Sequence, residues 1–293
     1  MNRRSVLSLA APALGGALAA CGAAGGSSAP GGKGAPETQY AVQVASSDLA
    51  VGKNRVAFVV LKFTKGMEAP ARIPDAQVNL KYYFPIEKEP APRGDGTAQF
   101  WSVDSKDKGL YVTQGQFDQA GNWGLEVSGT AGGAAFGPAR AAFMVKPKPE
   151  TPAIGAPAPR SRNLTRYDVD DIKKIDSGLK PNDMHELSIA DAIEQKKPLV
   201  IVFGSPGFCV TQTCAPEVEE VQKLKAKVGD KANFVHVEIW KDPIKREPYP
   251  TVTEWGLPTD PWVFLVDRNG LVADKFEGPA PLSELEASLA KLL

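Results

Sequence analysis

The stretch that decides the fold reads Leu199-Val-Ile-Val-Phe203-Gly-Ser-Pro-Gly-Phe208-Cys209-Val-Thr-Gln-Thr-Cys214-Ala-Pro216. Its first five residues form an unbroken apolar run, which is typical of a strand buried on both faces of a sheet. From Pro216 to Val228 apolar side chains recur at helical spacing, and Gly229 supplies a stop. The two cysteines are therefore predicted to lie between a buried strand and the start of a helix.

The spacing of Cys209 and Cys214 carries information about their chemistry. Five residues apart on a continuous helix, their Cα atoms would be about 8.6 Å apart, which a disulfide cannot bridge. We therefore expect Cys209 in a loop and a helix that starts near Cys214 or Ala215. A disulfide closing so short a loop adds little stability, whereas a helix N-terminus stabilises a thiolate. For the Cys209–Cys214 pair we therefore favour reversible redox exchange. An inert or regulatory disulfide and a metal site remain the alternative functions of this pair.

The surrounding region, residues 163–293, alternates predicted helices and strands. Capping boxes at Ser188–Asp191 and Ser283–Glu286 start its first and last helices. Three further strands are predicted, at Phe234–Trp240, Trp262–Val266 and Leu271–Phe276, and the turn Asp267-Arg-Asn-Gly270 joins the last two. This order predicts an α/β domain with one parallel βαβ half and one antiparallel hairpin half.

Two signatures in this region resemble the thioredoxin-like superfamily, chiefly its extracytoplasmic TlpA/ResA-like branch. They are the strand-and-cysteine stretch above and Gly256-Leu-Pro-Thr-Asp260-Pro261-Trp-Val-Phe-Leu-Val-Asp267-Arg-Asn-Gly270. The resemblance implies a thioredoxin-like fold and an enzyme that exchanges thiols and disulfides with exported proteins. It also implies a redox-active disulfide without an organic cofactor. The chain departs from the superfamily because four residues, rather than two, separate its cysteines.

The resemblance assigns roles to individual residues. The superfamily's cis-proline, which faces the cysteines across a substrate groove, falls at Pro261, with Pro258 as the second choice. By analogy Cys209 attacks and Cys214 resolves, although the helix-dipole argument points to Cys214 as the attacking thiol. Asp260, Phe208 and Trp262 flank the proposed groove, but both aromatic residues are equally typical of a core. A buried Asp260 would raise the pKa of the thiols.

Two other functions remain open. The first is copper delivery by a protein resembling the Sco carriers, with Cys209, Cys214 and His236 as the metal ligands. His236 shares a predicted strand face with Phe234 and Glu238, which favours a core position, and His185 is expected in a loop. The second is a non-catalytic lipoprotein that uses a thioredoxin-like scaffold to bind a partner.

The N-terminal residues predict export and a lipid anchor. A basic start, Met1-Asn-Arg-Arg, precedes an apolar run that ends in Leu18-Ala-Ala-Cys21, and this pattern resembles a bacterial lipobox. Residues 1–20 are therefore predicted to be a signal peptide and Cys21 the lipid attachment site. Residues 21–37, rich in Gly, Ala and Ser, read as a flexible tether. The expected location is the cell envelope, outside the cytoplasm and anchored to the membrane.

Residues 38–146 are predicted to form a separate all-β domain. Short apolar segments alternate with turn residues such as Gly94-Asp95-Gly96, a pattern that favours an immunoglobulin-like sandwich. Residues 147–162, with five prolines, read as a semi-rigid linker to the second domain. The 34 basic and 34 acidic residues balance, and no basic stripe is evident, so nucleic acid is not expected as a partner.

Overall fold

The computed structural model describes residues 38–293, except 89–90, 103–108 and 211. The predicted signal peptide, Cys21 and the tether therefore lie outside the described residues. Among the helices that are described, none combines the length and the apolar character needed to cross a membrane.

The N-terminal part contains eight described strands, all paired antiparallel. They are β1 (Thr38–Val44), β2 (Gly52–Thr64), β3 (Ala71–Arg72), β4 (Gln77–Tyr83), β5 (Gly94–Ser102), β6 (Gly109–Phe117), β7 (Gly121–Ala131) and β8 (Ala134–Val145). The strand order is β1-β2-β6-β5-β4-β7-β8, with β3 paired to β2. The two end strands, β1 and β8, also contact each other, so the sheet curls almost into a closed barrel.

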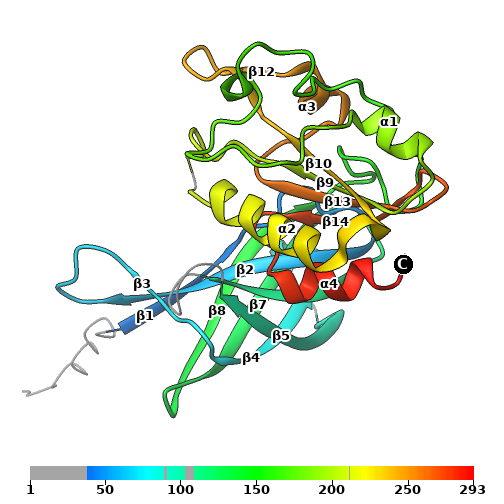
Figure 1. Ribbon diagram of the computed structural model, residues 1–293. Helices are drawn as coiled ribbons and strands as arrows, with labels where there is room; N and C mark the ends of the chain where they lie inside the picture. Colours follow the sequence, from blue (N-terminus) through cyan, green and yellow to red (C-terminus); the bar gives the residue numbers. More distant parts are fainter. Residues whose placement is uncertain (1–37, 89–90, 103–108, 211) are drawn as a thin grey trace, which may run out of the picture. The chain divides into compact units, whose positions relative to one another are not determined.

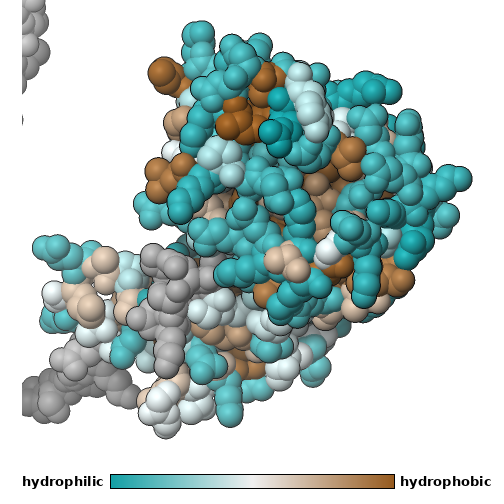
Figure 2. All heavy atoms as spheres, viewed as in Figure 1, coloured by the Kyte–Doolittle hydropathy of each residue, from teal (hydrophilic) through white to brown (hydrophobic). Residues whose placement is uncertain are grey.

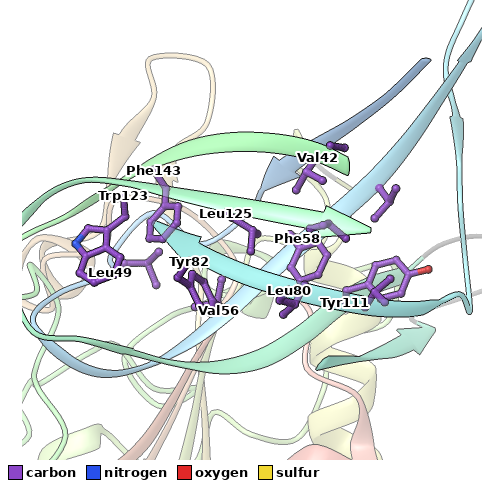
Figure 3. Packing of buried hydrophobic residues seen from close by; sticks show 14 of the residues in the cluster. Val42, Leu49, Val56, Phe58, Leu80, Tyr82, Tyr111, Trp123, Leu125 and Phe143 are labelled. Atoms are coloured by element: carbon purple, nitrogen blue, oxygen red, sulfur yellow. The ribbon is translucent and has the colours of Figure 1, made fainter. Parts of the chain in front are cut away.

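Alternating side chains from these strands fill the inside of the curled sheet (Figure 3). Val56 and Phe58 on β2 point inward, as do Trp123 and Leu125 on β7, which follows from the period of two along a strand. Tyr111 places its hydroxyl in this core, where it accepts a hydrogen bond from Ala76 N–H and donates one to Ile73 O. Burying a phenol here costs little because both of its hydrogen-bonding functions are satisfied.

Strand β5 corrects the prediction for this part. The sequence places a turn at Gly94-Asp95-Gly96, but these residues begin β5, which pairs with β4 on one side and β6 on the other. Most β5 side chains are exposed, so the strand lacks the apolar alternation that reveals a strand in sequence. Because β5 pairs with both β4 and β6, the strands form one continuous sheet. The prediction of an all-β part is confirmed, whereas the immunoglobulin-like sandwich is not confirmed.

The C-terminal part is built on a four-stranded sheet in the order β10-β9-β13-β14. Its strands are β9 (Leu199–Phe203), β10 (Asn233–Val237), β13 (Trp262–Val266) and β14 (Val272–Glu277), and a separate pair is formed by β11 (Trp240–Asp242) and β12 (Glu247–Pro248). Strand β10 is parallel to β9, whereas β13 is antiparallel to both β9 and β14. This is the predicted arrangement of a parallel βαβ half and an antiparallel hairpin half.

Helices cover both faces of this sheet (Figure 1). Helices α1 (Ile189–Glu194) and α3 (Pro250–Glu254) lie on one face, and α2 (Cys214–Val228) and α4 (Leu282–Leu289) lie on the other. The first face packs around Trp255, whose ring contacts Phe203 and Phe264. On the second face, side chains of α2 and α4 such as Val221 and Leu285 cover the sheet. The central strands are thus buried on both sides, as their apolar runs require.

The two predicted capping boxes have different outcomes. Ser188 caps α1 by accepting a hydrogen bond from Asp191 N–H at 3.2 Å. Ser283 caps nothing, because α4 already begins at Leu282, where the N–H donates to the Glu220 carboxylate at 2.8 Å. A carboxylate from α2 therefore supplies the helix cap that the sequence pattern assigns to Ser283.

The proline-rich segment is in part an edge of the C-terminal sheet. Gly155 N–H donates to Val272 O, Ala158 N–H donates to Gly270 O, and Pro157 forms an isolated bridge with Leu271. Ala158 is buried in the same core as Trp255. This half of the segment is thus docked beside β14, while the semi-rigid linker and the domain boundaries stay predictions.

Candidate functional site

Strand β9 and helix α2 together position the two cysteines. The chain leaves β9 at Phe203, passes through a turn and reaches Cys209, which is partly exposed. Cys214 is the first residue of α2, and its side chain is completely buried. The structure therefore places Cys209 in a loop and starts the helix at Cys214, as the spacing requires. The two cysteines are not joined by a disulfide in this structure.

A carboxylate lies beside the two thiols. The sulfur atoms of Cys209 and Cys214 and a carboxylate oxygen of Asp260 all lie within 4.8 Å of one another. Cys214 Sγ donates to Asp260 Oδ2 over 3.6 Å. The next peptide bond, Asp260–Pro261, is cis, so Pro261 and not Pro258 is the cis-proline. We call Cys209, Cys214 and Asp260 the cysteine site.

The environment of Cys214 keeps its thiol protonated. Its hydrogen bond with Cys209, its burial and the negative charge of Asp260 raise the pKa of Cys214 far above its ordinary value. A hydrogen bond from the Ser205 backbone lowers the pKa of Cys214 but does not offset these effects. These effects oppose the stabilisation that the helix N-terminus gives to a Cys214 thiolate. Burial and the charge of Cys209 likewise raise the pKa of Asp260, although its hydrogen bond with Cys214 opposes that rise.

The predicted groove aromatics differ in exposure. Phe208, next to Cys209, is 51% exposed and can contact a partner. Trp262 is 1% exposed, stacks on Phe264 and donates its Nε1–H to Thr259 Oγ1 at 3.1 Å. Trp262 is thus a core residue.

On the face shown in Figure 2, hydrophilic side chains predominate and hydrophobic ones form small separate patches.

The third ligand of the predicted copper set lies elsewhere. His236 is buried on β10, and its Nε2–H donates to Gly204 O at 3.0 Å. Its Nδ1 accepts from Asn182 Nδ2 at 2.8 Å, so the hydrogen bonds define a neutral imidazole. Burial lowers the pKa of His236 further, with a contribution from the nearby His185. Among the described residues, the two cysteine sulfurs gather with Asp260 and not with His236, whose ring nitrogens contact Asn182 and Gly204.

His236 instead belongs to a group that sequence reasoning missed. Asp176, His185 and His236 are all buried, and their side-chain ligand atoms lie within 4.8 Å of one another. We call these three residues the histidine cluster. They come from three segments that no motif connects, so their only sequence signal is that they include both histidines of the chain. His185, expected in a loop, is indeed outside regular structure, but it is 2% exposed.

The histidine cluster is tied to the cysteine loop. Ser177, the residue after Asp176, accepts a hydrogen bond at Oγ from Gly207 N–H over 2.9 Å. The Ser177 N–H donates to the buried carboxylate of Glu238, also over 2.9 Å. Because Gly207 lies two residues before Cys209, the position of this loop depends on the segment that carries Asp176.

Comparisons with known proteins give likenesses among solved structures only. No protein-family model matches the chain, and no curated protein matches it. Among solved structures, a thioredoxin-family thiol:disulfide interchange protein from Chlorobium tepidum TLS is 16% identical. The match covers 36% of this chain and 85% of that one, with a TM-score of 0.30. A likeness at this level identifies neither a substrate nor a catalytic residue, so the chemistry must be inferred from the cysteine site itself.

Proposed function

We propose that this protein is a membrane-anchored, extracytoplasmic thiol–disulfide oxidoreductase that acts on exported proteins. One observation carries the proposal: a partly exposed thiol, Cys209, lies beside a buried thiol that retains its proton, Cys214, at the start of α2. An exchange reaction needs this division, because one sulfur must reach the substrate while the other waits to resolve the mixed disulfide.

The proposed reaction follows from the exposure of the two thiols. The Cys209 thiolate attacks one sulfur of a substrate disulfide, forming a mixed disulfide and releasing the other substrate sulfur as a thiolate. Cys214 then loses its proton and attacks Cys209 Sγ. A Cys209–Cys214 disulfide forms, the second substrate sulfur leaves as a thiolate, and the substrate gains two electrons. The same steps in reverse oxidise a substrate dithiol.

Asp260 is the proposed proton acceptor in the second step. Its Oδ2 already receives the Cys214 Sγ hydrogen bond at 3.6 Å. Burial raises the pKa of Asp260, and this effect remains when Cys209 is held in the mixed disulfide, so the carboxylate is a better base than an exposed aspartate. Removal of the proton would give the otherwise unreactive Cys214 the thiolate it needs.

Substrate contact is proposed to begin around Cys209. Phe208 and Val210 flank this cysteine and are exposed by 51% and 78%. An unfolded or extended segment of an exported protein would present apolar side chains to them. The cell-envelope location rests on the predicted signal peptide and on a lipid at Cys21. Replacing Cys21→Ser should move the protein from the membrane fraction to the soluble exported fraction.

A redox titration tests the central proposal. The purified protein is equilibrated in graded glutathione and dithiothreitol buffers, the thiols are trapped, and their number is counted by mass. We expect reversible closure of the Cys209–Cys214 pair with a midpoint between about −120 and −270 mV. A pair that stays oxidised below about −300 mV would be structural, and a pair that never closes would also contradict exchange.

Two matched variants separate the roles of the thiols. With a disulfide-bonded model peptide, Cys214→Ser should accumulate a mixed disulfide at Cys209, because the resolving sulfur is missing. Cys209→Ser should accumulate none over the same period, because its remaining active-site sulfur is buried. Equal trapping by both variants would show that the assignment of attacking and resolving thiols is wrong.

A further inference from the structure

The histidine cluster has a donor set of two imidazoles and one carboxylate. Asp176 Oδ2 lies 3.1 Å from His185 Nε2 and 3.8 Å from His236 Nδ1. Ligand atoms bound to one Zn²⁺ at about 2.0–2.2 Å lie about 3–3.5 Å apart. The observed separations are close to these values, so small side-chain movements would let all three residues bind one ion. From this geometry we propose that Asp176, His185 and His236 bind a divalent first-row transition metal such as zinc.

The fold brings these three ligands to one place. His236 lies on β10, an edge strand of the sheet, and its N–H donates to Met184 O at 2.8 Å. This bond lays residues 182–185 along β10 and brings His185 next to His236, with their ring centroids 4.9 Å apart. Asp176 joins them because its carboxylate accepts the Asn182 backbone N–H at 2.8 Å.

The surroundings orient two of the three ligands, His236 and Asp176, in the way that metal sites require. His236 donates Nε2–H to Gly204 O, so its Nδ1 lone pair faces Asp176. A backbone carbonyl behind a ligating imidazole is the usual second contact of a metal-bound histidine. Asp176 Oδ1 accepts the Gly178 N–H at 2.9 Å, which fixes the other side of the carboxylate. His185 Nδ1 is buried and has no hydrogen-bond partner among the described residues. The hydrogen bonds of these residues therefore do not explain why this imidazole is buried.

The side-chain amide of Asn182 occupies the place between Asp176 and His236 where a metal ion would bind. Asn182 Nδ2 donates both to Asp176 Oδ2 and to His236 Nδ1, each over 2.8 Å. The two acceptor lone pairs thus converge on one donor, as they would on a cation. Asn182 Oδ1 accepts the Met184 N–H, which orients the amide in this way. A bound metal would replace the two N–H donors with a single positive charge.

An acidic cavity offers a path for a cation. The cavity has a volume of about 480 Å³ and is lined by Asn182 and His185. Its wall also carries four carboxylates and one guanidinium, from Asp170, Asp171, Asp183, Glu186 and Arg166. This excess of negative charge raises the local concentration of cations at the mouth. Donor type, spacing, orientation and access therefore all agree with a metal site that is separate from the cysteine site.

Metal binding is tested in a chain that cannot use its thiols. All three cysteines are replaced by serine, and the purified protein is titrated with Co²⁺ and then with Zn²⁺. We expect one Co²⁺ per chain, with d–d absorption bands and no sulfur-to-cobalt charge-transfer band, and displacement of Co²⁺ by Zn²⁺. Absence of stoichiometric binding in this folded chain would overturn the proposal.

Three further substitutions in the cysteine-free chain locate the metal. His185→Gln removes one ligand and should weaken Co²⁺ binding by at least about tenfold. Asn182→Asp replaces the competing amide donor with a carboxylate and should strengthen binding, a gain that a misfolded protein cannot produce. Asp230→Asn, at an exposed position outside the cluster, should leave the affinity unchanged. If His185→Gln and Asn182→Asp both bind Co²⁺ with the affinity of the cysteine-free parent, the metal lies elsewhere and the proposal is overturned.

Discussion

Glu217 on helix α2 offers a quantitative test of how burial controls charge in this protein. Its side chain is 1% exposed, and Oε2 accepts the Ala280 N–H at 2.7 Å. The second oxygen, Oε1, has no hydrogen-bond partner among the described residues. Burial raises the pKa of Glu217 from 4.5 to about 8, against the opposing effect of the Ala280 hydrogen bond.

The direction of the pH dependence follows from this raised pKa. Below pH 4.5 the carboxyl is protonated in both the folded and the unfolded chain, so its contribution to stability is fully present. Above pH 4.5 the unfolded chain releases the proton while the folded chain keeps it until about pH 8. The free energy of unfolding therefore falls by about 1.4 kcal/mol per pH unit across this window. At pH 7, which is 2.5 pH units above 4.5, the loss reaches about 3 kcal/mol.

The variant Glu217→Gln removes this titration while keeping an oxygen acceptor for Ala280. We expect its free energy of unfolding to be close to that of the parent at pH 5 and about 3 kcal/mol higher at pH 7. Urea unfolding followed by tryptophan fluorescence at pH 5, 6, 7 and 8 measures the difference. Glu219→Gln, at an exposed position on the same helix, is the matched control and should follow the parent. A difference between Glu217→Gln and the parent that does not change with pH would refute the reasoning.

Three other predictions concern the cysteine site and the core. Iodoacetamide at neutral pH should modify Cys209 at least about tenfold faster than Cys214, because Cys209 is partly exposed whereas Cys214 is buried. Peptide mass analysis should show this, and equal rates would contradict the difference in burial. In a Cys209→Ser background, Asp260→Asn should lower the pKa of Cys214 by removing a neighbouring negative charge. Thiolate absorbance at 240 nm against pH measures this, and an unchanged or higher midpoint would rule out the charge effect. Trp255→Ala should lower the free energy of unfolding by about 3–5 kcal/mol, since it empties a fully buried site between Phe203 and Phe264. Urea unfolding measures this change. A loss under about 1 kcal/mol would contradict the prediction and show that the core closes around the cavity.

Local signals in the sequence determined most of the C-terminal part. The apolar runs Leu199–Phe203 and Trp262–Val266 are the strands β9 and β13 with identical bounds. Ser188 and Gly229 mark the start of α1 and the end of α2. Each of these features depends on residues within one turn or one strand, so the neighbouring sequence carries the whole signal.

Contacts between distant segments decided the rest. Strand β5 is mostly exposed and is held by backbone pairing on both of its edges, which no side-chain pattern encodes. Asp260 changes the protonation of Cys214 only because the chain before β13 returns to the start of α2. Asp176, His185 and His236 meet because β10 is an end strand of the described sheet and takes the segment around Met184 along its outer edge. The sequence by itself thus determined the cysteine pair and the strands around it. Tertiary packing decided the burial and the charge of the side chains in the cysteine site and in the histidine cluster. The physical reason is that both properties depend on which remote groups exclude water from each side chain.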